Sequence, residues 1–375
     1  LEIDYGRSFS AENSITIGQG LIHAVIGQTK IVYFKPITEN KKPFKGQINL
    51  ETKLVHKKSA EEKQCEVTLE ETGSYEIRYC PVYRGKHQLH INVNKISVRG
   101  SPFTIAVTGL GNPIRVIRGL RKPRGVVVNS KNQLVVVDGN RTCVSVLTPE
   151  GDRIQSFGQL RNAFGVTVDQ DDNVYVIEQS RCSVSKFSAE GVLLATTGKK
   201  GRGNLEFNNP FDISYNWGDK NLYVTDNGNK RIQVLTTDLT FVGNFGSRGS
   251  GDGEFMSPVC AAFDSANNIY VTDLVNRRIQ VFDIDGHFLR NFSYKVNGLA
   301  QYLPFAIAID SNDTVYVSDA TFNRVTAFTP DGVFLTTFGG PKSKEGWFGK
   351  FSGFCIDRND SIIASDCPHN RLQIF

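Results

Sequence analysis

The chain has 375 residues, of which 39% are hydrophobic and 22% are charged, and its formal net charge is only +5. These proportions exclude a mainly disordered chain, and the length is sufficient for two or three domains with hydrophobic cores. No segment has the roughly 18 consecutive apolar residues that a membrane-spanning helix needs, so we expect no association with a membrane.

Residues 1–108 contain short segments in which apolar and polar residues alternate, a pattern typical of half-buried β-strands. The clearest of them are residues 30–34, 74–79 and 87–93, and polar turns separate them. About seven such strands in roughly 100 residues predict an immunoglobulin-like β-sandwich. The Cys-Trp-Cys core of antibody domains is missing from the sequence, which excludes that subclass.

Residues 109–375 contain six copies of one repeat. In each copy the second strand ends in an acidic residue, and a loop and a third strand follow it. Most copies continue with an acidic-Gly turn and a fourth strand. The acidic residues, which we call the anchor acids, lie 40, 48, 47, 46 and 47 residues apart at Asp138, Glu178, Asp226, Asp273, Asp319 and Asp366. Four antiparallel strands at this period predict the blades of a six-bladed β-propeller.

The last repeat ends at residue 375, after its third strand. The missing fourth-strand pattern occurs at residues 113–119, which match the fourth strand of the first repeat at residues 152–158. We therefore predict that this N-terminal strand completes the sixth blade and closes the ring. The predicted fold class is all-β, with the sandwich over residues 1–108 and the propeller over residues 109–375.

Motifs in both predicted domains resemble known families. Ile-Gly-Gln-Gly-Leu at 17–21, Glu-Thr-Gly-Ser-Tyr at 71–75 and above all Gly-Ser-Pro-Phe at 100–103 resemble a filamin-type immunoglobulin repeat. The six blades resemble NHL repeats, most closely at residues 228–234 and 276–282. A filamin repeat followed directly by an NHL propeller is similar to the C-terminal half of tripartite-motif NHL proteins.

This resemblance implies a function and a missing part. Members of the family carry a RING finger, B-boxes and a coiled coil upstream, act as E3 ubiquitin ligases, and in several lineages repress messenger RNAs through the propeller. The resemblance implies zinc only in those missing modules and no cofactor here. Because the first residue is Leu1 rather than Met, we expect a piece of a longer chain. We expect this piece itself to have no enzymatic activity.

Blade geometry sorts the charges of the propeller between two faces. The loop between the second and third strands lies on the same face as the incoming loop, which is the segment before the first strand of a blade. Residues 110–375 hold 28 Lys and Arg against 27 Asp and Glu, but most cations fall on this basic face and most acids on the opposite, acidic face. The distribution predicts a surface that attracts a polyanion.

Ten residues are candidates for contacts on the basic face. Cations could bind phosphates, Phe rings just before a first strand could stack on unpaired bases, and Asn could read a base edge. The candidates are Arg124, Arg141, Arg161, Phe164, Arg181, Phe211, Lys230, Arg277, Phe305 and Asn323. Blades without Phe at this position have Arg124, Val259 or Gly353 there.

Each candidate also has a structural alternative. The cations could be solvated surface charges, the Phe rings could be buried beneath a loop, and Asn in a tight loop could serve a left-handed backbone. Arg also recurs at one repeat position beside the anchor acids, and we expect these pairs to fasten the blades together. These recurring residues are Arg231, Arg278, Arg324 and Arg371.

The sequence argues against enzymes of the kinds found on propellers, and we expect no small-molecule substrate. A metal-dependent lyase or lactonase needs several ligands around the channel, whereas the propeller has only His287 and His369, predicted on opposite faces. No Gly-x-Ser-x-Gly motif is present. The Gly-rich residues 198–203 and 249–253 precede no helix-like pattern and are predicted to be loops between blades rather than phosphate cradles.

Cysteine usage predicts a cytoplasmic location. The seven cysteines include no Cys-x-x-Cys pair and are interpreted as reduced thiols. Four Asn-x-Ser/Thr sequons would instead favour secretion, although such a short pattern often arises by chance.

Two functions remain open. The first is RNA binding by the basic face, to a single strand or a hairpin. The alternative is recruitment of a protein substrate for ubiquitination through the same face. Nothing in the sequence decides between them or gives the target or the oligomeric state.

Overall fold

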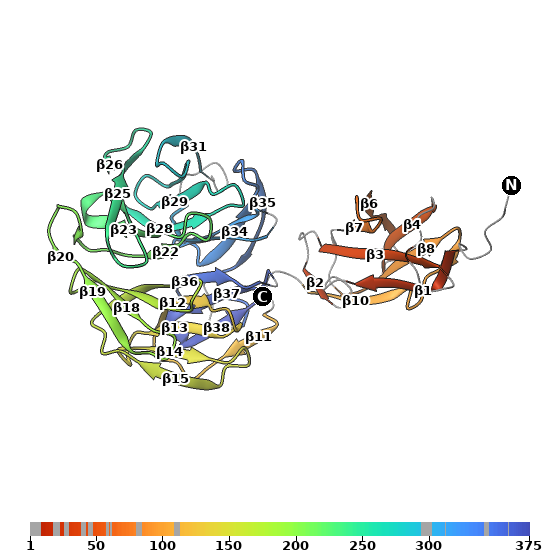
Figure 1. The fold of residues 1–375 in the computed structure, drawn as a ribbon, viewed down its shortest axis with the longest axis horizontal. Coiled ribbons are helices and arrows are strands. Elements are labelled where there is room, and N and C mark those ends of the chain that lie inside the picture. The colour runs from red at the N-terminus through yellow and green to blue at the C-terminus, as the bar shows by residue number, and fades with distance from the viewer. Residues whose placement is uncertain are drawn as a thin grey trace. The chain divides into compact units, whose positions relative to one another are not determined.

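A computed structural model describes residues 9–17, 23–25, 30–38, 43, 48–57, 60, 62–79, 85–108, 113–293, 302–311, 313–340, 345–358 and 360–375. The chain forms two compact units, Leu1–Asn112 and Pro113–Phe375. The boundary predicted after residue 108 borders residues outside the described ranges. The described residues form strands, turns and two short 3-10 segments, so the fold is all-β as predicted (Figure 1).

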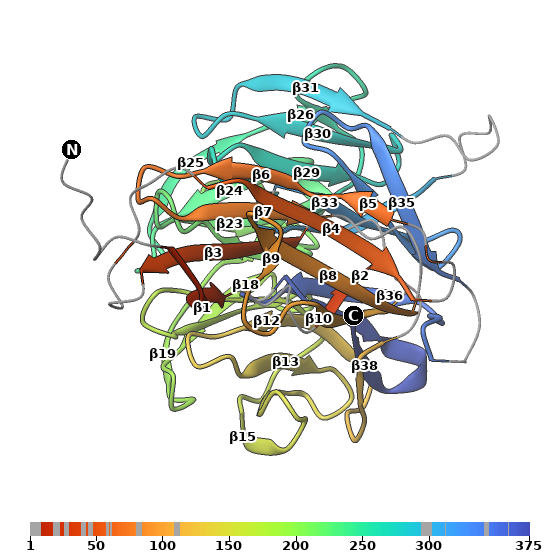
Figure 2. The same cartoon turned by 90° about the vertical axis from the view of Figure 1, so that its right-hand side faces the viewer.

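The first unit is a sandwich of two sheets. One sheet has the order β1 (Phe9–Ile17), β3 (Lys30–Thr38), β7 (Tyr75–Tyr79) and β6 (Glu66–Leu69). The other has the order β2 (His23–Val25), β10 (Phe103–Thr108), β8 (Gly85–Val93), β4 (Leu50–His56) and β5 (Glu62–Gln64), and β9 (Ile96–Ser97) pairs with β8. The pairing of β4 with β8 can be followed in Figure 2.

The alternation of the sequence explains this core. Val32 and Phe34 of β3 and Ile77 of β7 are buried, as are Leu89 and Ile91 of β8, and they pack in one cluster. Alternate residues of β3 and β8, and Ile77 of β7, therefore face the opposite sheet, which removes apolar surface from water. The predicted immunoglobulin-like sandwich is confirmed.

The second unit is a ring of six four-stranded antiparallel sheets. Blades 1 and 2 comprise β12 (Pro123–Val128), β13 (Leu134–Asp138), β14 (Cys143–Leu147) and β15 (Arg153–Phe157), then β16 (Ala163–Val168), β17 (Val174–Glu178), β18 (Ser183–Phe187) and β19 (Leu193–Thr197). Blades 3 and 4 comprise β22 (Ile213–Tyr215), β23 (Leu222–Asp226), β24 (Arg231–Leu235) and β25 (Phe241–Phe245), then β28 (Pro258–Phe263), β29 (Ile269–Asp273), β30 (Arg278–Phe282) and β31 (Phe288–Phe292). Blades 5 and 6 comprise β32 (Pro304–Ile309), β33 (Val315–Asp319), β34 (Arg324–Phe328) and β35 (Phe334–Gly339), then β36 (Phe351–Ile356), β37 (Ile362–Asp366), β38 (Arg371–Ile374) and β11 (Arg115–Ile117).

The ring closes as the sequence predicts. Orange-yellow β11 lies beside blue β38 in Figure 1, and Arg115 is opposite Ile374 in an antiparallel pair. The N–H of Ile114 extends the pairing by donating to the carbonyl oxygen of Ile374 at 2.7 Å. The start of the propeller thus supplies the fourth strand of the sixth blade.

Three serine–aspartate clasps join neighbouring blades on the acidic face. In the clasp between blades 4 and 5, the N–H and hydroxyl of Ser265 donate to the two carboxylate oxygens of Asp313 at 2.8 and 2.6 Å. Equivalent bonds join blades 1 and 2 and blades 5 and 6, through Ser130 with Asp172 and Ser311 with Asp360. Acids that the sequence places on an exposed face therefore hold the ring together.

Candidate nucleic-acid interface

The six anchor acids organise the basic face. Each is buried at the end of a second strand and accepts a backbone N–H from the incoming loop of its own blade. In blade 3, for example, Asp226 accepts the N–H of Asn208 at 2.8 Å, and in blade 6 Asp366 accepts that of Gly349 at 3.0 Å. The corresponding donors for Asp138, Glu178, Asp273 and Asp319 are Arg121, Arg161, Ser257 and Leu303. These bonds bring the two loops of each blade together on one face.

The recurring arginines neutralise the anchor acids of blades 3 to 6, but the elements that they connect differ from the predicted ones. Arg231 lies 3.0 Å from Asp226 and also donates to the carbonyl oxygens of Gly203 and Glu206. Those two oxygens belong to the incoming loop of the same blade. The pair therefore fastens a loop to its own blade, whereas we expected it to fasten one blade to another.

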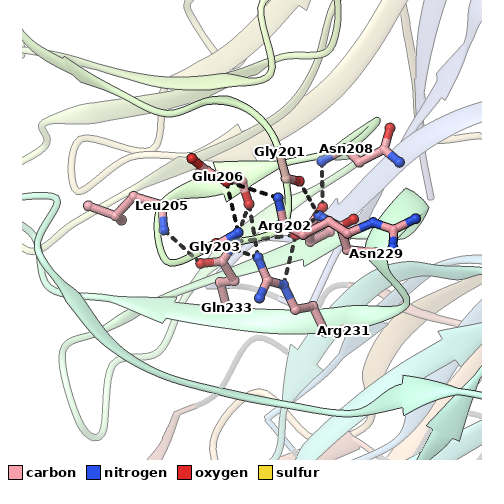
Figure 3. Close-up of polar contacts among 10 residues, drawn as sticks. Gly201, Arg202, Gly203, Leu205, Glu206, Asn208, Asn229, Arg231 and Gln233 are labelled. Carbon is pink, nitrogen blue, oxygen red and sulfur yellow. Dashed lines mark hydrogen bonds and ion pairs between the residues drawn. The ribbon is translucent and has the colours of Figure 1, made fainter.

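Figure 3 shows this incoming loop of blade 3. Between its short strands β20 (Lys199–Lys200) and β21 (Glu206–Phe207), the Glu206 carboxylate accepts the N–H groups of Arg202 and Gly203 at 3.0 and 2.9 Å. The blade 4 loop, between β26 (Ser247–Arg248) and β27 (Glu254–Phe255), repeats this arrangement. These N–H groups already have carboxylate acceptors, in keeping with a loop between blades rather than a phosphate cradle.

In blades 1 and 2 other arginines pair with the anchor acids: Arg141 and Arg153 with Asp138, and Arg181 with Glu178. Third strands there begin with Cys143 and Ser183, so no Arg occupies the usual position. Arg141 lies 3.4 Å from Asp138, and Arg181 binds both oxygens of Glu178 at 2.9 and 3.0 Å. Their side chains remain 38% and 47% exposed, so they can still contact a ligand, but part of their charge is neutralised.

Lys230, Arg277 and Asn323 share one position of the repeat. Each precedes a third strand and has a left-handed backbone, with φ of 60°, 58° and 50°. The residues at this position in the other blades, Thr142, Cys182 and Asn370, have the same conformation. The left-handed backbone favours Asn at such a position, which supports the structural alternative for Asn323. Burial, followed by the nearby charge of Arg248, lowers the pKa of half-buried Lys230.

The three candidate Phe rings meet at the centre of the face. Phe164 of blade 2 lies 4.3 Å from Phe211 of blade 3, and Phe211 contacts Phe305 of blade 5 edge-on at 5.3 Å between ring centroids. Arg124 of blade 1 lies over the Phe164 ring at 4.6 Å and donates to the carbonyl oxygen of Ala163. We call Arg124, Phe164, Phe211 and Phe305 the hub cluster. Its Phe residues are half-buried, so part of their surface remains accessible.

The register of the sixth blade corrects one assignment at the hub. Phe351 lies opposite the anchor acid Asp366, as Pro304 lies opposite Asp319 in blade 5. The residue that corresponds to Phe305 is therefore Ser352 rather than Gly353. Both strands carry the same bulge, and Phe305 and Ser352 each lie 14 residues before the anchor acid of their blade.

A set of cations on the basic face has no acidic partner. Arg161 is exposed, and its guanidinium makes no ion pair or hydrogen bond within the described ranges. The same holds for the exposed side chains of Arg121, Lys122, Lys200, Arg202 and Arg248, which the candidate list omitted. We call these six the unpaired cations. All six belong to incoming loops. The backbone N–H groups of Arg161 and Arg121 donate to anchor acids, and those of the other four do not. No sequence signal separates these six residues from the paired cations.

The two histidines of the propeller each bind an aspartate on a different face. His369 binds Asp366 at 2.9 Å on the basic face, whereas His287 binds Asp283 at 3.0 Å in an exposed turn. Ligand atoms of Asp283, Asp285 and His287 come within 4.8 Å of one another. Backbone N–H groups of the same turn donate to Asp283 and lower the pKa of its carboxyl, so the turn itself accounts for this cluster.

Comparisons with known families agree with the two-part fold. Residues 8–104 match the Filamin/ABP280 repeat, and residues 207–302 match a 6-bladed beta-propeller. The chain therefore carries a filamin repeat and a six-bladed propeller. A comparison with curated proteins gave no match.

Solved structures resemble the chain in fold. A protein of unknown function from Bacteroides thetaiotaomicron has 11% identity and a TM-score of 0.56, and the match covers 100% of this chain and 98% of that one. A gluconolactonase from Xanthomonas campestris has 17% identity and a TM-score of 0.54, covering 70% and 90%. Virginiamycin B lyase from Staphylococcus aureus, crystallised with quinupristin, has 13% identity and a TM-score of 0.52, covering 70% and 87%. At these identities the likeness concerns the fold alone.

No helix in the described part of the chain is long and apolar enough to cross a membrane. The six cysteines of the described ranges are not joined by disulfides, and Cys80 lies outside those ranges.

Proposed function

We propose that the propeller binds RNA on its basic face, as the target-recognition module of a cytoplasmic protein of the tripartite-motif NHL type. A filamin repeat followed by a propeller suggests an interaction module. The observation that carries the RNA proposal is the set of six unpaired cations beside an aromatic hub. This fragment would select the target, and the ubiquitin ligase chemistry would belong to RING modules elsewhere in the full protein.

The charge balance of the face supports a polyanionic ligand. An Arg that already binds a buried carboxylate offers a phosphate little net charge, whereas Arg161, Arg202 and Arg248 keep theirs. Phosphate contacts supply most of the affinity of nucleic-acid binding and make it salt-dependent. Lys and Arg at these positions are therefore the residues that we assign to the RNA backbone.

The hub cluster supports contacts with unpaired bases. Phe164 and Phe211 are half-buried, and Arg124 covers part of one ring. Bases stack on aromatic rings and on guanidinium planes, and such contacts contribute roughly 1–3 kcal/mol per base. A single strand or the loop of a hairpin could offer an unstacked base to this cluster, whereas a continuous duplex could not.

Selection against a random RNA pool, followed by a salt series, tests the proposal. Charge reversal of Arg161 and Arg202 together should weaken the best ligand by about tenfold or more and reduce the salt slope by about 2. Reversal of Lys131, an exposed cation in a turn of the acidic face, is the matched control and should leave affinity unchanged. Equal losses in both variants, or no enriched motif, would move the assignment to the alternative, capture of an acidic protein substrate for ubiquitination.

A further inference from the structure

The first strands of all six blades surround a cavity of about 650 Å³ along the ring axis. Ring contacts between Phe164, Phe211 and Phe305 narrow its end at the basic face. At the other end its walls include Trp217, in the turn between β22 and β23, whose exposure of 58% places that end at the surface. The cavity has the size of a small-molecule site.

One level of the cavity wall consists almost entirely of small residues. At equivalent positions of the six first strands or just before them lie Gly125, Gly165, Asp212, Cys260, Ala306 and Gly353. Adjacent blades approach closely here: a Cβ at Gly165 would lie only 2.5 Å from the Asp212 carboxylate. Asp212 is therefore the exception in this ring, and its carboxyl fills the space that the missing side chain of Gly165 leaves.

No cation of the described ranges forms an ion pair with Asp212. The groups that face its carboxyl are the Cys260 thiol from β28, the N–H of Ile213 in the next position of its own chain, and the backbone of Gly165 from β16. Burial raises the pKa of Asp212 to about 7, and these two hydrogen bonds lower it only in part. Asp212 is one of the residues that line the cavity, and part of its surface remains accessible.

We propose that this cavity binds a small organic cation, with a primary ammonium group paired to the Asp212 carboxylate and an apolar body against the strand walls. A buried carboxylate is costly without a partner, and a cation supplied by a ligand would remove that cost. Most other side chains along the wall are aliphatic or aromatic, such as Val166, Ile307 and Phe354. They would contact the hydrocarbon part of the ligand.

The chemistry of Asp212 makes this binding dependent on pH. An ammonium ion binds the ionised carboxylate, whereas the protonated form offers it only a neutral acceptor. With a pKa near 7, about nine-tenths of Asp212 is ionised at pH 8 and about one-tenth at pH 6. Affinity should therefore fall about tenfold from pH 8 to pH 6.

Benzylammonium chloride is the probe, benzyl alcohol is its neutral counterpart, and binding is followed by ligand-detected NMR at pH 8. We expect the ammonium ion to bind the 375-residue chain at least tenfold more tightly than the alcohol and to lose that advantage in Asp212→Asn. The neutral amide keeps the shape of the carboxyl, so this variant should fold. Asp357→Asn, at another carboxyl of the cavity wall, should retain binding.

Three results would overturn the proposal. They are equal binding of the two probes, equal losses in Asp212→Asn and Asp357→Asn, or affinity of the unmodified protein that does not change between pH 8 and pH 6. The site is independent of the basic face. Arg161→Glu with Arg202→Glu should therefore lose RNA and keep the ammonium ion, so the two proposals fail separately.

Discussion

The two faces of the propeller use their charges in different ways. On the acidic face, Asp172, Asp313 and Asp360 clasp serines of neighbouring blades. On the basic face, buried acids neutralise one set of arginines, while Arg161 and Arg202 have no such partner. The number of charges on a face is therefore a poor measure of what a ligand meets. The charges that remain after internal pairing are the relevant quantity: on the basic face they include Arg161 and Arg202, whereas on the acidic face Asp171 and Asp331 are exposed and form no ion pair within the described ranges.

The largest effect on stability should come from an anchor acid. Asp226→Ala leaves Arg231 without its carboxylate and the N–H of Asn208 without an acceptor. Loss of one partner of a buried pair costs about 3–5 kcal/mol of unfolding free energy. Urea denaturation measures this loss. Asp238→Ala, at an exposed acid of the same blade, serves as the control and should cost less than about 0.5 kcal/mol.

The pH dependence of stability should report Asp212, which lacks the cation that the anchor acids have. Its folded pKa of about 7 exceeds that of an exposed Asp, about 4, so the unfolded chain releases this proton first. Unfolding free energy should fall as pH rises from about 4 to 7, by roughly 1.4 kcal/mol per unit of pKa difference. Denaturation of the unmodified protein and Asp212→Asn at pH 5 and pH 8 tests this. An equal pH effect in both proteins would contradict the assignment.

A clasp of the acidic face should have an intermediate effect. Asp313→Ala removes two hydrogen bonds to Ser265 and should cost about 1–2 kcal/mol. Ala also fits the left-handed backbone at residue 313 (φ 59°) poorly, so Asp313→Asn is the more conservative comparison. Thermal unfolding measures both variants: Asn keeps an oxygen that can accept a bond from Ser265 and suits the left-handed backbone, so it should lose less stability than Ala, and an Ala variant as stable as the unmodified protein would contradict a role for the clasp.

The smallest effect on stability should come from the unpaired cations. Arg161→Glu and Arg202→Glu break no ion pair of the described residues, so the unfolding free energy should change by less than about 0.5 kcal/mol. Arg181→Glu, by contrast, faces Glu178 with a like charge and should destabilise blade 2. A measurable destabilisation by Arg161→Glu would show that its charge has a structural partner.

The fold follows from the sequence because its signals are local and repeated. Alternating strands, anchor acids at a fixed period and a displaced fourth strand each depend on a few neighbouring residues. The pairing of the cations was harder to predict. Arg141 and Arg181 lie only three positions after their anchor acids, but the repeat pattern hides this local pairing because Cys143 and Ser183 replace the usual Arg. The contacts of Arg231 with Gly203 and Glu206 depend on tertiary geometry, since these residues are more than 20 positions apart.

The sequence predicted which Phe residues lie on the basic face, but not that they contact one another in the hub cluster. The sequence indicates that Phe164, Phe211 and Phe305 belong to one face, yet their mutual contacts arise only when the ring closes. The same limit applies to Asp212, since its burial depends on Gly165 in one neighbouring blade and Cys260 in the other. No pattern within a single repeat carries that information.

The pairing of β11 with β38, which completes the sixth blade, also determines when the propeller can close during folding. Arg115 and Ile374 are 259 positions apart (374 minus 115), so β11 has no partner until the whole propeller sequence has left the ribosome. Contacts between such distant residues form slowly, because a long loop must close first. During synthesis β11 therefore waits as an unpaired strand, and a cut that removes either end of the propeller would convert a closed ring into an open arc with an exposed edge.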